Sequence, residues 1–105
     1  MSTERPLILV VNDDGITAPG IRYLIRLMKY VGDVVVVAPD GPQSGMGHAI
    51  TLDATLHVEQ VYIDKGVQKE YACSGTPVDC LKLAINKLLP RKPDLCVSGI
   101  NHGSN

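Results

Sequence analysis

The chain has 105 residues, a formal net charge of −1 at pH 7, and 45% hydrophobic and 20% charged residues. This length and composition are typical of one small globular domain that can bury an apolar core. A charge so close to zero excludes bulk electrostatic attraction to nucleic acid or to anionic lipid. The sequence holds no apolar stretch long enough to span a bilayer, and its polar first residues lack the apolar segment of a secretory signal. We therefore expect a cytoplasmic protein that binds neither a nucleic-acid duplex nor a membrane.

The expected core is aliphatic, because the sequence contains no phenylalanine and no tryptophan. The three cysteines form no Cys-x-x-Cys pair, which favours reduced thiols in the cytosol over a disulfide framework. Each is expected to be a small buried core residue. They are Cys73, Cys80 and Cys96.

The first predicted strand covers residues 7–12, where an unbroken apolar run indicates a strand buried on both faces, as in a parallel sheet. A helix is expected from Pro19 to about Tyr30, because proline fits the first turn and apolar residues recur at helical spacing. Residues 34–38 form a second apolar run, so the spacing predicts a parallel βαβ unit. The expected buried stripe of the helix is Ile21, Leu24, Ile25, Leu27 and Met28, and the expected charged face is Arg22, Arg26 and Lys29.

The middle of the chain combines a loop with a hairpin. Residues 39–47 contain three glycines and two prolines, which predicts a loop at the carboxyl end of the second strand. Two extended runs follow at 55–63 and 67–73, with a glycine in the short connection between them. This pattern predicts a β-hairpin, which we expect to project from the main sheet.

A second helix is expected to begin at Pro77, with Thr76 as the N-cap and Asp79 completing a capping box. Its apolar residues cover most of its circumference, so we expect it to be well buried. These residues are Leu81, Leu83, Ala84, Ile85, Leu88 and Leu89. Residues 95–97 then form a third parallel strand. The elements together predict a doubly wound, Rossmann-like α/β fold, a three-layer αβα sandwich with a mostly parallel sheet.

Each of the three parallel strands is followed by a polar loop that contains glycine. Asp13 and Asp14 follow the first strand, Ser44 lies in the loop after the second, and Asn101 follows the third. The carboxyl ends of neighbouring parallel strands meet at one edge of a sheet, so we expect these four side chains to lie close together. Each of them has a simpler interpretation as a turn-forming residue.

The four side chains supply carboxylate, hydroxyl and carboxamide oxygens. Such hard donors suit Mg²⁺ or Mn²⁺, with Ca²⁺ also possible, rather than Zn²⁺. Two adjacent carboxylates beside an apolar strand repel each other and lose hydration, and a bound cation relieves both effects. A divalent cation can polarise a phosphoryl oxygen and lower the pKa of a bound water. The residues therefore indicate metal-assisted hydrolysis, with a phosphate ester as one candidate substrate.

Four blocks of residues come in the order found in a known family. They are Asn-Asp-Asp-Gly at 12–15 with Ala-Pro-Gly at 18–20, Val-Ala-Pro-Asp at 37–40 with Ser44 and Gly45, Gly-Thr-Pro-Val-Asp-Cys at 75–80, and Ser-Gly-Ile-Asn at 98–101 with Gly103 and Asn105. Together they cover nearly the whole chain and resemble the SurE (survival protein E) family. The resemblance implies a metal-dependent phosphatase that acts on nucleoside 5′- and 3′-monophosphates, and in some members on short polyphosphate.

By this resemblance, one divalent ion would be held by Asp13, Asp14, Ser44 and Asn101. Asn105 matches an asparagine near the phosphate, and Asn12 would contribute to substrate binding. The family uses a metal-activated water without a phospho-enzyme. Either Asp13 or Asp14 is expected to act as the general base.

The family is expected to run to more than twice this length. Its members carry a later Tyr-Ser-Gly-Thr segment, which helps to hold phosphate, and C-terminal strands and an arm used in dimers and tetramers. Residues 1–105 are therefore expected to be the N-terminal part of a single SurE-like domain. The complete protein is expected to be a homo-oligomer.

Two other classes of protein share part of this pattern. A signalling receiver domain also binds Mg²⁺ through an acidic pair after its first strand, and Asp40 would then be the phosphate acceptor. No lysine ends the last strand here, which disfavours that interpretation. A haloacid-dehalogenase-like phosphatase would use Asp13 as a nucleophile. That chemistry usually needs an Asp-x-Asp spacing, whereas the two acids here are adjacent.

Overall fold

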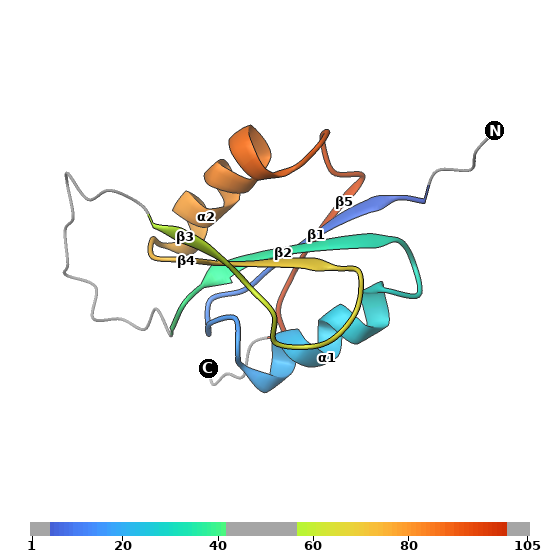
Figure 1. Cartoon of the computed structure of the whole chain (residues 1–105), viewed down its shortest axis with the longest axis horizontal. Helices are drawn as coiled ribbons and strands as arrows, with labels where there is room; N and C mark the ends of the chain where they lie inside the picture. Colours follow the sequence, from blue (N-terminus) through green and yellow to red (C-terminus); the bar gives the residue numbers. More distant parts are fainter. Residues whose placement is uncertain (1–4, 42–56, 101–105) are drawn as a thin grey trace.

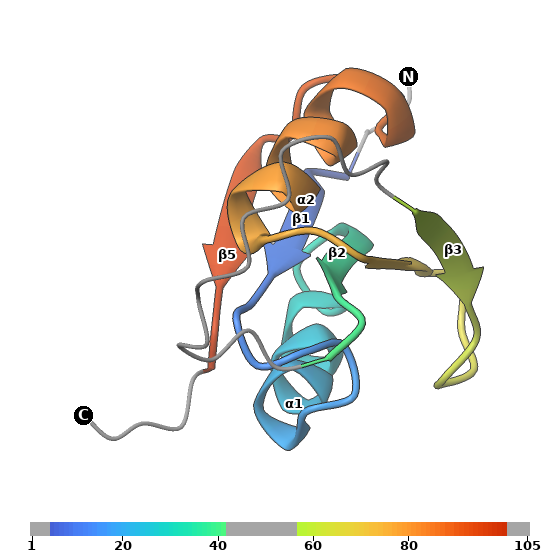
Figure 2. The same ribbon diagram turned by 90° about the vertical axis from the view of Figure 1, so that its left-hand side faces the viewer.

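A computed structural model describes residues 5–41 and 57–100. Its five-stranded sheet has the strand order β3-β4-β2-β1-β5 and separates two helical layers (Figures 1 and 2). The elements are β1 (Leu7–Val11), α1 (Pro19–Met28), β2 (Asp33–Pro39), β3 (Val58–Val61), β4 (Lys69–Cys73), α2 (Pro77–Leu83), its π-helical continuation η1 (Ala84–Leu88) and β5 (Leu95–Ser98). Strands β4, β2, β1 and β5 are parallel, and only β3 is antiparallel to its neighbour. The predicted doubly wound α/β fold is confirmed.

The core lies in two layers because successive residues of a strand point to opposite faces of the sheet. On one face, Ile8 and Val10 of β1 pack with Ile21 of α1. On the other, Leu9 packs with Cys80 of α2. Both faces of β1 and β2 are therefore covered, which is why their sequences are unbroken apolar runs. Among the described residues, no helix is long and apolar enough to cross a membrane.

The chain adds strands to the sheet on both sides of β1. The connection through α1 leads to β2 on one side of β1, and the connection through α2 and η1 leads to β5 on the other. The two connections lie on opposite faces of the sheet (Figure 2). A crevice forms outside the carboxyl ends of the strands at such a switch point, and ligands bind there in open α/β sheets.

The hairpin was expected to project from the sheet, and this expectation is wrong for its second strand. β4 pairs in parallel with β2 over five residues, from Val35 opposite Lys69 to Pro39 opposite Cys73. β3 then forms the edge of the same sheet, antiparallel to β4. The hairpin extends the sheet because the end of β2 offers unpaired backbone groups that β4 satisfies.

The start of α2 is as predicted. The Thr76 hydroxyl accepts a hydrogen bond from the Asp79 backbone N–H, and the Asp79 carboxylate accepts one from the Thr76 N–H, both at 3.1 Å. The helix is less buried than expected, since its fully buried residues are Cys80 in α2 and Ala84 in η1. Ile85 is 46% exposed. Only one side of the α2–η1 segment contacts the sheet, although its apolar residues surround it.

Two further expectations about burial are wrong. Cys96 is exposed, whereas Cys73 and Cys80 are buried as expected. Cys96 lies in β5, which pairs only with β1 among the described strands, so the helical layers cover its side chains less completely. Arg22 was assigned to the charged outer face of α1, yet it is only 8% exposed. It is buried because carboxylates from the hairpin surround its guanidinium group.

Candidate active site

The carboxyl ends of β2, β1 and β5 lie next to one another, as the sequence predicted. Two hydrogen bonds join the loops that follow these strands. The Ile16 N–H donates to the Pro39 carbonyl at 2.9 Å, and the Gly99 N–H donates to the Val11 carbonyl at 3.0 Å. The loop after β1 is therefore tied to the end of β2, and the end of β1 to the residue after β5.

The loop after β1 carries two carboxylates at its tip. Asp13 is exposed and Asp14 is partly buried. Asn12 beside them is 1% exposed. Its amide Nδ2 donates to the Gly15 carbonyl at 2.8 Å, and its Oδ1 accepts from the Gly15 N–H at 3.3 Å. These bonds close the turn across the two acids and fix its backbone from within.

Glycine is required at the end of this turn. Gly15 has φ of +107°, a conformation that residues with a side chain rarely adopt. A Cβ atom there would lie 3.1 Å from the carbonyl carbon of Gly41. The loop after β1 and the loop after β2 therefore approach closely at this point, and Gly41 leads towards Ser44.

A second close approach brings the end of the described chain to the start of α1. A Cβ atom on Gly20, in the first turn of α1, would collide with the carbonyl oxygen of Ile100. Asn101 is the next residue in the sequence. The segment that leads to Ser44 thus approaches the end of the acidic turn, and the segment that leads to Asn101 approaches the start of α1. Ser44, Asn101 and Asn105 themselves lie outside the described residues, so their positions remain predictions.

The donor set of the loop is consistent with a divalent cation. Asp13 and Asp14 supply adjacent carboxylates on a turn whose backbone is held by Asn12. Hard oxygen donors on a fixed backbone fit Mg²⁺ or Mn²⁺. Within residues 5–41 and 57–100, no cluster of three or more His, Cys, Asp or Glu side chains could hold a metal by itself. A complete coordination shell would therefore need oxygen ligands from other residues, such as the predicted Ser44 and Asn101.

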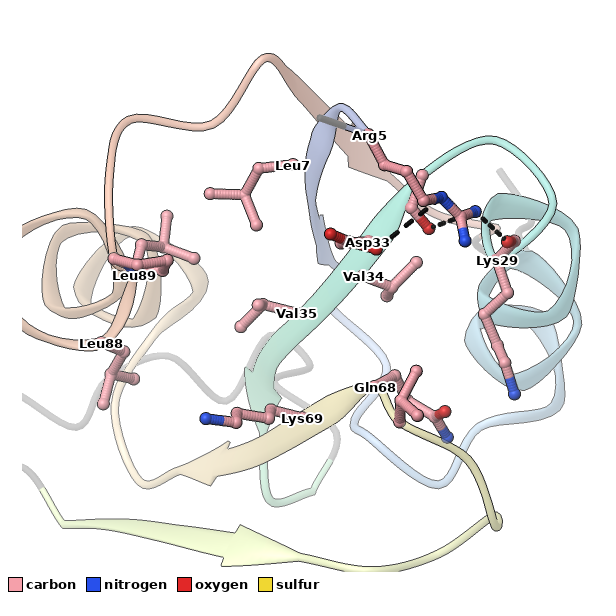
Figure 3. A pocket seen from close by; sticks show the side chains of 13 residues that line it. Arg5, Leu7, Lys29, Asp33, Val34, Val35, Gln68, Lys69, Leu88 and Leu89 are labelled. Atoms are coloured by element: carbon pink, nitrogen blue, oxygen red, sulfur yellow. Dashed lines mark hydrogen bonds and ion pairs between the residues drawn. The ribbon is translucent and has the colours of Figure 1, made fainter. Parts of the chain in front are cut away.

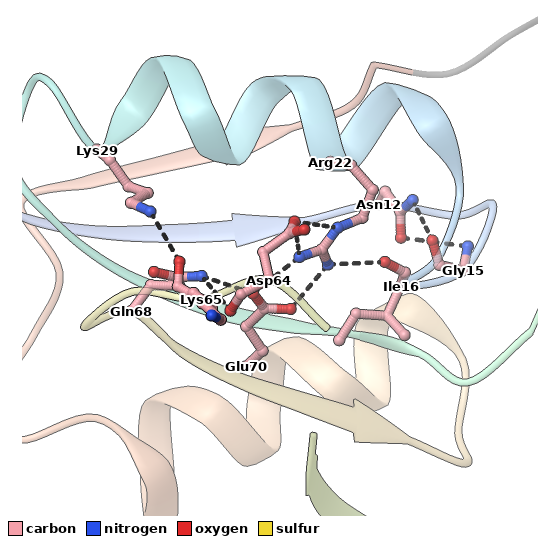
Figure 4. Close-up of polar contacts among 9 residues, drawn as sticks. All are labelled: Asn12, Gly15, Ile16, Arg22, Lys29, Asp64, Lys65, Gln68 and Glu70. Atoms are coloured by element: carbon pink, nitrogen blue, oxygen red, sulfur yellow. Dashed lines mark hydrogen bonds and ion pairs between the residues drawn. The ribbon is translucent and has the colours of Figure 1, made fainter. Parts of the chain in front are cut away.

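The sequence pattern did not reveal the buried charges that support this loop. The Arg22 guanidinium donates to the Ile16 carbonyl at 3.0 Å and pairs with Glu70, which is 2% exposed (Figure 4). Glu70 lies 48 positions away in the sequence, in β4. No local signal links the two residues, because a charged residue in a helix is ordinarily assigned to the solvent side.

A cavity of about 660 Å³ opens at the opposite, amino end of the sheet (Figure 3). Its walls include Leu7, Val35 and Leu89, with Arg5 and Lys69 at its margin. It does not include the acidic loop, and its one carboxylate, Asp33, faces Arg5 at 3.7 Å. We place the candidate site at the carboxyl end, because adjacent acids, a fixed turn and three converging loops occur there.

The fold and this edge together define a class. The molecule is a doubly wound α/β domain with an acidic turn at its switch point, an arrangement suited to a metal-assisted reaction on an anionic substrate. Comparison with known proteins narrows the class to one family. The family model for "Survival protein SurE" matches residues 8–105, and the chain belongs to that family.

Individual relatives agree with this assignment. A Flavobacterium johnsoniae protein named 5′-nucleotidase SurE is 68% identical over 105 residues, which are all of this chain and 40% of that protein. A Bacteroides fragilis protein of the same name is 54% identical over all of this chain and 41% of its own length. A crystal structure of the SurE protein from Aquifex aeolicus matches with a TM-score of 0.78 and 44% identity, covering 95% of this chain and 39% of that one. The chain thus spans about two-fifths of the length of these relatives.

Proposed function

We propose that this chain forms the metal-binding part of a phosphatase that hydrolyses nucleoside 5′-monophosphates, and also 3′-monophosphates, to nucleoside and phosphate. The observation that carries the proposal is that the residues following β2 and β5 approach the segment from the acidic turn to the start of α1, at the switch point of the sheet. The name of these relatives, 5′-nucleotidase SurE, supports the substrate class. Short polyphosphate is a second proposed substrate.

In this proposal, the residues divide into ligands and supports. Asp13, Asp14, Ser44 and Asn101 would hold one divalent ion, Mg²⁺ or Mn²⁺. When bound, that ion would polarise a phosphoryl oxygen and lower the pKa of a bound water. Asp13 or Asp14 would accept the proton of the attacking water as general base. Asn105 would lie near the phosphate.

Asn12 is best explained as a support for the two carboxylates. Both polar atoms of its amide are bonded to Gly15, and the side chain is buried. We therefore propose that Asn12 acts on substrate binding through the shape of the turn. For the complete protein we further propose a cytoplasmic location and assembly into dimers or tetramers, as the family resemblance implies.

The test is phosphate release by the complete polypeptide that contains this chain, measured on a panel of nucleoside monophosphates with Mn²⁺, Mg²⁺ or EDTA. We expect release that needs the metal. Asp13→Asn and Asp14→Asn should each lower it by at least about 100-fold, more than the loss from altering a group that only orients a ligand. Asp33→Asn is the matched control, because this aspartate lies at the opposite end of the sheet.

The outcomes separate the proposed function from its alternatives. Release that is equal with EDTA, or that is unchanged by Asp13→Asn and Asp14→Asn, would contradict a metal site at this turn. A covalent phospho-aspartate would contradict direct attack by water. It would indicate a haloacid-dehalogenase-like mechanism if found on Asp13, or a receiver domain if found on Asp40.

A further inference from the structure

The guanidinium group of Arg22 is fully occupied by hydrogen-bond acceptors, of which Glu70 and Ile16 are buried and Asp64 is exposed. Nε and Nη2 donate to the Asp64 carboxylate at 3.1 and 2.6 Å, and Nη1 and Nη2 donate to the Glu70 carboxylate at 2.7 and 2.8 Å. The remaining Nη1–H donates to the Ile16 carbonyl at 3.0 Å. An arginine side chain has five N–H groups, and each has a partner here. The planar fork therefore fixes three separate segments of the chain relative to one another.

Both carboxylates that bind Arg22 come from the β3–β4 hairpin. Glu70 lies in β4 and is 2% exposed, and Asp64 lies in the turn between β3 and β4. Gln68 supports both, since its Nε2 donates to the Glu70 carboxylate at 2.9 Å and to the Asp64 carbonyl at 3.2 Å. Figure 4 shows these side chains converging between α1 and the hairpin.

The ion pair between Arg22 and Asp64 favours the charged form of both residues. Burial by itself would lower the pKa of Arg22, but hydrogen bonds and charge attraction from Glu70 and Asp64 outweigh it and raise that pKa above its usual value. The same contact from Arg22 lowers the pKa of Asp64. A buried carboxylate without its cation is costly, so Glu70 and Arg22 each require the other.

The third partner, Ile16, belongs to the loop that carries the acids. Its side chain is 3% exposed, its N–H donates to the Pro39 carbonyl, and its carbonyl accepts from Arg22. Ile16 is two residues after Asp14. The turn is thus held at its start by Asn12 and at its end by Arg22.

We propose that Arg22 is a positioning residue for the candidate metal site: with Glu70 and Asp64 it sets the end of the acidic turn, and so links the hairpin to metal affinity. This inference rests on the proposed function, because it concerns the cation that Asp13 and Asp14 would bind. Arg22 donates to the Ile16 carbonyl, and through this bond it acts on the turn. A lysine keeps the charge but has no planar fork that could reach all three partners.

The experiment measures Mn²⁺ binding to the complete polypeptide, with free Mn²⁺ followed by electron paramagnetic resonance and with no substrate present. Arg22→Lys is expected to raise the dissociation constant about 10-fold, the usual scale for an altered outer-shell group. Asp64→Asn keeps the buried Glu70 pair and alters a carboxylate that is 41% exposed, so it should raise the constant less than Arg22→Lys does. Arg26→Lys, at an exposed position one turn further along α1, is the matched control and should leave binding unchanged.

Thermal unfolding of the same variants separates positioning from stability alone. If Arg22→Lys and Asp64→Asn lower the melting temperature while the folded proteins bind Mn²⁺ as tightly as the parent, the positioning role is overturned but the proposed function stands. If the parent protein itself binds no Mn²⁺, both are overturned. If Arg22→Lys does not fold, Asp64→Asn decides, and weaker binding by that folded variant supports the inference.

Discussion

Aspartate side chains have different surroundings at the two ends of the sheet. At the amino end, Asp33 faces Arg5 at 3.7 Å, and Asp94 accepts hydrogen bonds from the Leu7 N–H at 2.7 Å and from Arg91 at 2.9 Å. At the carboxyl end, Asp13 is exposed and forms no ion pair with any cation of the described residues. Acids at the amino end hold the chain together, whereas the exposed carboxylate of Asp13 in the acidic turn is available to a ligand.

The two ends differ in which groups receive the supporting hydrogen bonds. At the carboxyl end the bonds go to the backbone of the turn, through Asn12 and Arg22, and the nearby cation Arg22 is already neutralised by Glu70 and Asp64. A rigid backbone that presents adjacent acids is expected of a cation site, because the ligands are held in place before the ion arrives. Three experiments test this difference between the two ends of the sheet.

The largest effect is expected from Gly15→Ala. The residue has φ of +107° and its new Cβ would lie 3.1 Å from the Gly41 carbonyl carbon, so the turn must distort. We expect a loss of about 1–3 kcal/mol in the free energy of unfolding, together with weaker Mn²⁺ binding. Chemical denaturation and Mn²⁺ titration measure the two effects.

The matched control for this variant is Gly41→Ala. A Cβ atom on Gly41 meets nothing within 4 Å among the described residues. Its unfolding free energy should stay within about 0.5 kcal/mol of the parent value. Equal destabilisation by the two substitutions would contradict the view that the conformation of Gly15 shapes the acidic turn.

A smaller effect is expected from Thr76→Ala, which tests whether every polar group at the carboxyl edge serves the metal. Thr76 follows β4 and caps α2 through its bond to the Asp79 N–H. Its loss should lower the unfolding free energy by about 1 kcal/mol, and Thr76→Ser should restore most of it. Mn²⁺ affinity should not change in either variant. A clear fall in that affinity would extend the site to the β4 loop.

The smallest effect concerns Asp94 at the amino end. The hydrogen bond from the Leu7 N–H, followed by the contact with Arg91, lowers its pKa below the usual value. The unfolded chain then binds a proton more readily, so this carboxylate stabilises the fold above the unfolded pKa of about 3.9. That contribution is lost as the pH falls through the lower folded value. Asp94→Asn should therefore flatten the dependence of unfolding free energy on pH below about 5; curves of equal slope would contradict the assignment.

Local patterns were enough to predict most of the elements. The apolar run of β1, the proline at the start of α1 and the capping box at Thr76 each depend on residues that are close in the sequence, and the structure places all three as expected. The meeting of the carboxyl ends of β2, β1 and β5 followed from the general rules for parallel sheets.

Features that depend on distant contacts were not predicted. Arg22 is buried because Asp64 and Glu70, 42 and 48 positions away, neutralise it. Cys96 is exposed because β5 has one neighbour among the described strands. The hairpin joins the sheet because β4 pairs with β2. None of these contacts leaves a periodic pattern in the sequence.

The class of fold, the edge of the sheet where the acids lie and the family of the chain could all be predicted from the amino-acid sequence. These predictions depend on hydrophobic periodicity and on motifs of adjacent residues. Such patterns lie within a single strand, helix or turn and do not require contacts with the rest of the molecule. Only the tertiary structure decided that Asn12 turns inward to Gly15 and that Arg22 reaches from α1 to the loop. The physical reason is that a buried polar group is tolerated only where partners surround it, and folding brings those partners together.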